Sequence, residues 1–138
     1  MSNVLAFDFG MNNIGIATGN TDTKVAFPYK SLKAKNGIPN WDILGTILKE
    51  WDPSFIIVGL PLDLHGNFLP EITQKAKKFA NRIHGRYGIK VIMHDERLTT
   101  VEAKSNLYQH HGFKKLDKDN IDNMSAVIIL ESWFEQNI

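Results

Sequence analysis

Cysteine is absent from the 138 residues of this chain. The absence excludes a disulfide framework and a thiolate metal site, and it suits a reducing compartment. The first residues lack the cationic start and long apolar core of a signal peptide, and no apolar run approaches the roughly eighteen residues of a membrane span. We therefore expect a cytoplasmic protein without membrane contact.

Net charge is also small, at +1, but the charges are unevenly distributed. Residues 72–116 carry ten Lys or Arg and three acidic residues, whereas the remaining segments carry six basic and twelve acidic residues. This asymmetry permits a basic face beside an acidic one, as in a protein that holds both a polyanion and a metal ion. A solvated helix surface explains the same charges and remains the alternative.

The length and the 43% share of hydrophobic residues fit a single globular domain over residues 1–138. Its first part predicts three successive strands, over 3–9, 14–19 and about 24–27, with Pro28 closing the third. Strands that follow one another through such short turns pair in antiparallel fashion.

Beyond residue 39 the pattern alternates between helices and strands. A continuous apolar run predicts a strand over 55–59 that is buried on both faces and therefore parallel, and 89–94 predicts a further strand. Apolar spacing and capping residues predict helices over 40–51, over 70–84, from Thr99 or Thr100 onward, and over 121–134. Gly85 and Gly88 end the second of these helices. The polar residues 109–120 predict a mobile loop before the last one. This order predicts an α/β fold of three layers, with a mixed sheet between helices.

Three acidic residues stand where this architecture can bring them together. Asp8 ends the first strand, Glu96 follows the last strand, and Asp122 lies at the start of the last helix. In open α/β sheets, ligands bind outside the carboxyl ends of the strands. Clustered carboxylates repel one another unless a cation lies among them, and oxygen ligands favour Mg²⁺ or Mn²⁺ over zinc. Two such ions about 4 Å apart support hydrolysis of a phosphodiester, which predicts a nuclease.

Neighbouring acids compete for these roles. Asp95 precedes Glu96, and since successive strand residues face opposite sides, one of the two can point into the site. Asp119 lies one helical turn before Asp122, where it can assist Asp122 or cap the helix.

Other polar residues have weaker patterns. Asp63 and His65 follow a predicted strand in a Pro- and Gly-containing loop, where they either flank the site or form a surface turn. Zinc-type spacing is missing around four histidines, which we expect to be exposed or in the core: His65, His94, His110 and His111.

Several motifs, taken in order over essentially the whole chain, together resemble the YqgF/RuvX family. They are Asp8-Phe-Gly10 with Ile14-Gly-Ile-Ala17, Ile57-Val-Gly-Leu-Pro61 with Gly66, Asp95-Glu-Arg-Leu-Thr-Thr100, and Ile121-Asp122 with Ala126, Ile129 and Leu130. That family is similar to the Holliday-junction resolvase RuvC and has a ribonuclease H-like fold. Its members are described as resolvases and as nucleases that mature the 5′ end of 16S ribosomal RNA.

The resemblance implies that Asp8, Glu96 and Asp122 are the catalytic, metal-binding acids. It places Arg97 beside the scissile phosphate, a task that suits a bidentate guanidinium. It also places Lys114 and Lys115 in a loop that embraces nucleic acid in relatives, although here that loop also contains Asp117 and Asp119.

The chain departs from the family pattern at two places. Where many relatives have a hydroxyl residue and then a basic one after Gly10, this chain has Met11, Asn12 and Asn13, which removes one phosphate contact. Asn123 stands where Ser is common.

The sequence therefore favours a Mg²⁺- or Mn²⁺-dependent nuclease acting on the ribosomal RNA precursor, and possible association with the ribosome. A Holliday-junction resolvase is the first alternative and would be a symmetric dimer, whereas an end-maturing ribonuclease can act as a monomer. A non-catalytic ribosome- or RNA-binding factor is the second, because fold alone does not establish function. The Asp-x-Gly hairpin also occurs in sugar kinases and actin-like ATPases, which need two such lobes.

Overall fold

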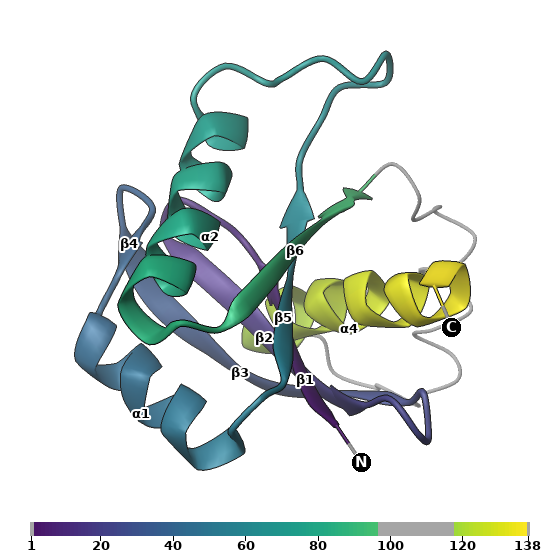
Figure 1. Ribbon diagram of the computed structural model, residues 1–138. Coiled ribbons are helices and arrows are strands. Elements are labelled where there is room, and N and C mark those ends of the chain that lie inside the picture. Colours follow the sequence, from purple (N-terminus) through teal and green to yellow (C-terminus); the bar gives the residue numbers. More distant parts are fainter. Residues whose placement is uncertain (1, 97–117, 138) are drawn as a thin grey trace.

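The computed structural model describes residues 2–96 and 118–137, with side chains over 2–96 and 123–137 (Figure 1). Its centre is a sheet with the strand order β4-β3-β2-β1-β5-β6. The strands are β1 (Asn3–Asp8), β2 (Asn13–Asn20), β3 (Ala26–Lys35), β4 (Ile38–Pro39), β5 (Phe55–Leu60) and β6 (Lys90–Asp95). The helices are α1 (Trp41–Trp51), α2 (Ile72–Tyr87) and α4 (Lys118–Asn137).

Strand pairing in the sheet is mixed. β1, β2, β3 and β4 pair in antiparallel fashion, whereas β1 pairs in parallel with β5, and β5 with β6. The prediction of a mixed α/β sheet is confirmed. Because β1, β5 and β6 run in parallel, their last residues, Asp8, Leu60 and Asp95, lie along one edge. We call this edge the carboxyl rim.

Two hydrophobic clusters cover the two faces of the sheet. Alternate β1 residues Leu5 and Phe7 pack into the cluster beneath α1 and α2. Val4 and Ala6 pack into the cluster beneath α4. This alternation is the period-two pattern of a strand buried on both faces, and it produces the three predicted layers.

α4 is buried over much of its circumference, since all five side chains from Ala126 to Leu130 are buried. It packs against β1, β2, β3 and β5. Ala126 and Ile129 of the family motif are buried, and Trp133 is partly buried. No helix within residues 2–96 or 118–137 is both long enough and apolar enough to cross a membrane.

The third predicted strand ends too early. β3 continues through Pro28 to Lys35, and Pro28 lies opposite Ala17 beside a register shift in β2. A proline cannot donate to a ladder, and a local irregularity of this kind is where a strand accommodates it. The hairpin between β3 and β4 was not predicted; its turn residues Asn36 and Gly37 both have positive φ, as a tight two-residue hairpin requires.

Helix ends differ from the sequence predictions by a few residues. Asn40 caps α1 as predicted, and its Oδ1 accepts from two backbone N–H groups. α2 continues through Gly85 and ends at Gly88, whose left-handed φ of 68° suits glycine. α4 already includes residues 118–120, which had been assigned to the loop. The predicted helix from Thr99 or Thr100 and residues 109–117 lie outside the described residues.

Candidate active site at the carboxyl rim

Asp8 occupies the carboxyl end of β1, the first strand of the rim. Val4 and Ala6, four and two residues before it, belong to the cluster beneath α4. Since side chains alternate along a strand, Asp8 lies on the α4 face of the sheet. It is partly buried, in contrast to the fully buried residues before it.

The turn after Asp8 is fixed by the neighbouring β3–β4 hairpin. The backbone oxygen of Asn12 accepts from Ala34 N at 2.9 Å, and that of Met11 accepts from Gly37 N at 2.8 Å. A Cβ on Gly10 would overlap the Asn13 carbonyl oxygen, so the turn requires glycine for close approach of the backbone. Asp8 is thus followed by a turn of defined geometry.

Glu96 follows β6 and lies over Gly59 of β5. A Cβ on Gly59 would be 2.5 Å from Glu96 Oε1 and 2.7 Å from Ile129 Cδ1 of α4. The Glu96 carboxylate is therefore on the α4 face, above the strand that separates β6 from β1. Asp95 has the same parity as Val91 and Met93, which pack on the α2 side. This arrangement is consistent with the prediction that one of the two acids faces the site, and it favours Glu96 as that acid.

The start of α4 is attached to β2 through Asn123. This residue is buried, and its Oδ1 accepts a hydrogen bond from Ile16 N at 3.2 Å. Ile16 pairs with Phe7, the residue before Asp8. The backbone of Asp122, adjacent to Asn123, is therefore held close to the end of β1; its side chain lies outside the described residues, as does that of Asp119.

A buried histidine joins the end of β6 to α4. His94 Nε2 and Ser132 Oγ are 2.9 Å apart, and both residues are buried. Burial lowers the pKa of His94 by disfavouring its charged form, and the nearby Asp95 carboxylate partly opposes this effect. The contact fixes the strand two residues before Glu96, and His94 is the core histidine among the four that were expected to be exposed or in the core.

The other predicted positions divide into two groups. Asp63 forms a surface turn, because its Oδ1 accepts from the backbone N–H groups of His65 and Asn67, both at 2.9 Å. His65 is exposed. Outside the described residues lie Arg97, His110, His111, Lys114, Lys115 and Asp117.

The described carboxylates suit a hard cation. Asp8 and Glu96 face the same side of the sheet at the carboxyl ends of β1 and β6, on either side of β5, and both offer oxygen ligands. Within the part of the chain that the structure describes, no three acidic or histidine side chains form a metal cluster. A third ligand would therefore come from a residue such as Asp122, whose backbone alone is described.

Sequence reasoning did not identify the contacts that support these acids. Gly59 gives room to Glu96, Asn123 holds the start of α4, and Ser132 holds His94. A glycine inside an apolar strand signals that another group approaches the backbone closely, and this signal could have revealed the contact between Gly59 and Glu96. The other two contacts join residues far apart in the sequence, and no local pattern marks them.

Solved structures of low sequence identity share this fold. RuvC of Thermus thermophilus matches with a TM-score of 0.62 at 13% identity, over 97% of this chain and 96% of that one. The resolvase of fowlpox virus matches with a TM-score of 0.59 at 15% identity, over 99% of both chains. The fold is therefore ribonuclease H-like, as the sequence predicted.

Relatives of known sequence are much closer. A protein of Photobacterium profundum named "Putative pre-16S rRNA nuclease" is 61% identical over 133 residues, which cover 96% of this chain and 94% of the relative. An Escherichia coli protein of the same name is 54% identical, with 96% of each chain covered. The family model described as "RuvX: Holliday junction resolvase" matches residues 2–136. The chain belongs to the RuvX family.

Proposed function

We propose that this chain is a metal-dependent nuclease that hydrolyses phosphodiester bonds in the precursor of 16S ribosomal RNA. The observation that carries the proposal is the placement of Asp8 and Glu96 on one face of the sheet at the carboxyl rim, with Glu96 over the intervening strand β5. The names of its relatives support the substrate. The reaction would take place in the cytoplasm, where ribosomal RNA precursors are processed.

In this proposal, Asp8, Glu96 and Asp122 hold Mg²⁺ or Mn²⁺. The ions supply Lewis acidity for attack of water on phosphorus and for departure of the leaving oxygen. The residues of the chain supply position. The fixed turn after Asp8 and the contact of Asn123 with Ile16 keep the ligand-bearing elements from drifting apart. Arg97, Lys114 and Lys115 are proposed to contact phosphates.

A second candidate is cleavage of a four-way DNA junction, which the description of the family model favours. The ion chemistry is common to RNA and DNA, because both have phosphodiester bonds. The two functions differ in geometry. A junction resolvase would act as a symmetric dimer that cuts two strands related by a two-fold axis, whereas an end-maturing ribonuclease can be a monomer.

The deciding experiment compares two labelled substrates, an immature 16S RNA 5′ end and a four-way DNA junction. Each is incubated with wild type or Asp8→Asn in Mg²⁺, in Mn²⁺ and in excess EDTA. Wild type is expected to cut the RNA, and Asp8→Asn or EDTA to lower the rate by at least about 10³-fold. Asp52→Asn is the matched control, since Asp52 is exposed beyond α1 in a left-handed conformation that Asn readily adopts.

The outcomes separate the candidates. Symmetric nicking of the junction with no RNA cleavage would replace the ribonuclease by a resolvase. If neither substrate is cut, the non-catalytic binding factor takes first place. If Asp8→Asn keeps near wild-type activity, Asp8 has no part in the mechanism.

A further inference from the structure

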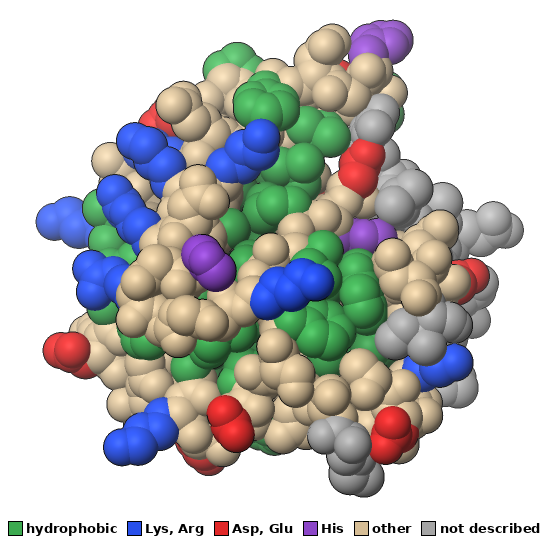
Figure 2. Space-filling model, viewed as in Figure 1, with side chains coloured by type: hydrophobic (Ala, Val, Ile, Leu, Met, Phe, Trp, Pro, Cys, Tyr) green, Lys and Arg blue, Asp and Glu red, His purple; other side chains and the backbone are tan. Residues whose placement is uncertain are grey.

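Exposed cations gather on α2, on the side of the sheet opposite α4. The helix sequence from Ile72 to Tyr87 contains no acidic residue. Figure 2 shows the Lys and Arg side chains over this part of the molecule. We use the name α2 basic face for five exposed residues: Lys77, Lys78, Arg82, Arg86 and Lys90.

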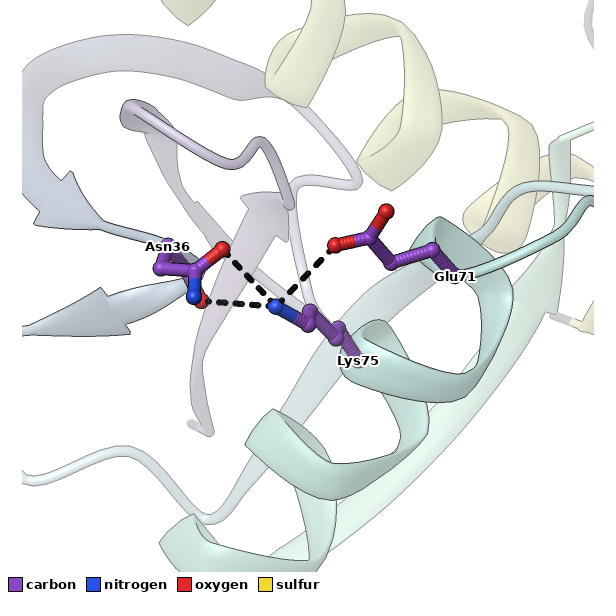
Figure 3. A network of polar contacts seen from close by, with 3 residues as sticks. All are labelled: Asn36, Glu71 and Lys75. Atoms are coloured by element: carbon purple, nitrogen blue, oxygen red, sulfur yellow. Dashed lines mark hydrogen bonds and ion pairs between the residues drawn. The ribbon is translucent and has the colours of Figure 1, made fainter.

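The α2 basic face is not neutralised by the acids that the structure describes. Among those residues, Lys75 makes the ion pair on this helix, at 3.3 Å from Glu71 Oε1, and it also donates to Asn36 Oδ1 at 2.8 Å (Figure 3). Lys75 therefore has a structural role in tying α2 to the β3–β4 hairpin. The Nζ of Lys77 and the guanidinium of Arg86 instead lie over aromatic rings, at 4.6 and 4.3 Å from their centroids.

Grooves on both sides of α2 bring these cations together with the neighbouring elements. One groove, of about 420 Å³, lies between α2 and β6, and its lining includes Lys77, His84 and Lys90. The other, of about 160 Å³, lies between α2 and the β3–β4 hairpin, and its lining includes Lys78 and Arg82. Rows of cations along shallow grooves match the charge of a phosphodiester backbone.

An exposed aromatic ring, Phe68, lies in the loop that joins the carboxyl end of β5 to α2. Phe68 is 55% exposed, and Lys77 covers one face of its ring. Its loop leaves the carboxyl end of β5, next to the strand end that carries Asp8. The buried Thr73 hydroxyl closes this loop: it donates to the Pro61 carbonyl and accepts from Leu69 N. The ring is thus presented from an ordered loop.

We propose that Phe68 and the α2 basic face bind a single-stranded nucleic acid segment next to the cleavage site. A base stacks on Phe68, and the phosphates that follow pair with the cations of α2. The strand must be single, because an exposed ring can stack only on a base that is outside a duplex. From Lys77 to Arg86 the helix rises by about 14 Å, so its cations are spread along the path of more than one phosphate. The inference rests on the proposed nuclease function for its choice of partner.

The first test removes the ring. Phe68→Leu is compared with Phe27→Leu, a matched control whose ring is 57% exposed on β3, away from α2. Binding of a fluorescein-labelled oligouridine of about twelve nucleotides is followed by anisotropy in EDTA, which prevents cleavage. Phe68→Leu is expected to raise the Kd about fivefold or more and Phe27→Leu to leave it unchanged. Binding of a duplex of the same length should be equal in both variants.

The second test removes charge. Lys78→Gln with Arg82→Gln is compared with Lys30→Gln with Lys49→Gln, two exposed cations on β3 and α1. The α2 double variant should lower the slope of log K against log salt by about 1.4, since each phosphate contact of a single strand contributes about 0.7. At about 50 mM salt its Kd should rise about tenfold, whereas the control pair should change neither quantity.

The results can be separated from those for the proposed function, because binding is measured without metal ions. If wild type cuts neither substrate but the α2 and Phe68 variants lose oligouridine binding, the surface stands and the nuclease assignment falls. If both variants bind oligouridine like wild type, the inference is wrong even for an active nuclease. The basic face would then be free for an acidic protein partner.

Discussion

The two faces of the sheet differ in the kind of polar group that they carry. On the α4 face, Asp8 and Glu96 lie at the carboxyl rim above an apolar cluster, and His94 is buried against Ser132. On the other face, α2 has exposed cations and no acid. The acids of the candidate site and the cations of α2 are thus separated by the layer of strands.

The separation has a physical reason. A lysine placed beside Asp8 and Glu96 would pair with them and compete with a metal ion for their oxygens. Cations on the far side of the sheet do not contact these carboxylates, and salt screens the interaction between exposed charges at longer range. They remain available to phosphates. A sheet between the acids and the cations thus lets one small protein offer separate surfaces to two ligands, a metal ion and a chain of phosphates.

The sharpest test of the comparison uses neighbouring acids on opposite faces. Glu96→Gln is expected to lower the cleavage rate by about 10³-fold, because it removes an anionic ligand from the α4 face. Asp95→Asn, one residue earlier, should retain most of the activity, since Asp95 shares the parity of β6 residues that pack towards α2. Cleavage of the labelled RNA in Mg²⁺ measures both. Equal losses in the two variants would contradict the assignment of faces.

The next test concerns the space above β5. Gly59→Ala puts a methyl group in contact with Glu96 and Ile129, so we expect a stability loss of about 1–3 kcal/mol and a cleavage rate about 10- to 100-fold lower. Gly85→Ala is the control on the α2 face. Apart from its chain neighbours and the adjoining backbone of α2, no atom of the described residues lies within 4 Å of its new Cβ, and a helical Ala should add about 0.5–1 kcal/mol.

Denaturant unfolding and RNA cleavage measure these two changes. A fully active Gly59→Ala variant would show that Glu96 does not need its position above β5. A destabilised Gly85→Ala variant would show that the α2 face is more closely packed at this glycine than the structure indicates.

The smallest expected effect is a pH dependence of stability from His94. Its pKa in the folded protein is lowered from the ordinary value of about 6.5, so the folded state binds fewer protons than the unfolded state below that pH. The free energy of unfolding should therefore fall as the pH drops below about 6.5, by at most about 1.4 kcal/mol per pH unit from this group. Above that pH the contribution is constant.

The measurement is urea unfolding between about pH 5 and pH 8. His94→Gln should remove this contribution, whereas His84→Gln, at an exposed position on α2, should retain it. If the free energy of unfolding of His94→Gln still depends on pH in this range, the dependence belongs to another group.

Local patterns in the sequence were sufficient for most elements. The apolar run of residues 55–59 predicted the buried parallel strand β5, and Asn40 marked the start of α1 because a side-chain cap acts over two or three residues. The hairpin of β3 and β4 was missed although Asn36-Gly37 is a strong turn signal. Pro28 by itself predicts a strand end; its place within β3 depends on a register shift in the neighbouring strand β2, which no local pattern shows.

By itself, the sequence determined the family, the order of elements and the candidate acids, since each depends on residue types at fixed spacing. Only the tertiary structure decided which acid faces α4, because this depends on strand register and on the room that Gly59 leaves for Glu96. The same holds for the contact of Asn123 with Ile16 and for the position of Phe68 beside Lys77. Such contacts join segments that are distant in the chain or differently oriented in space, and folding alone brings them together.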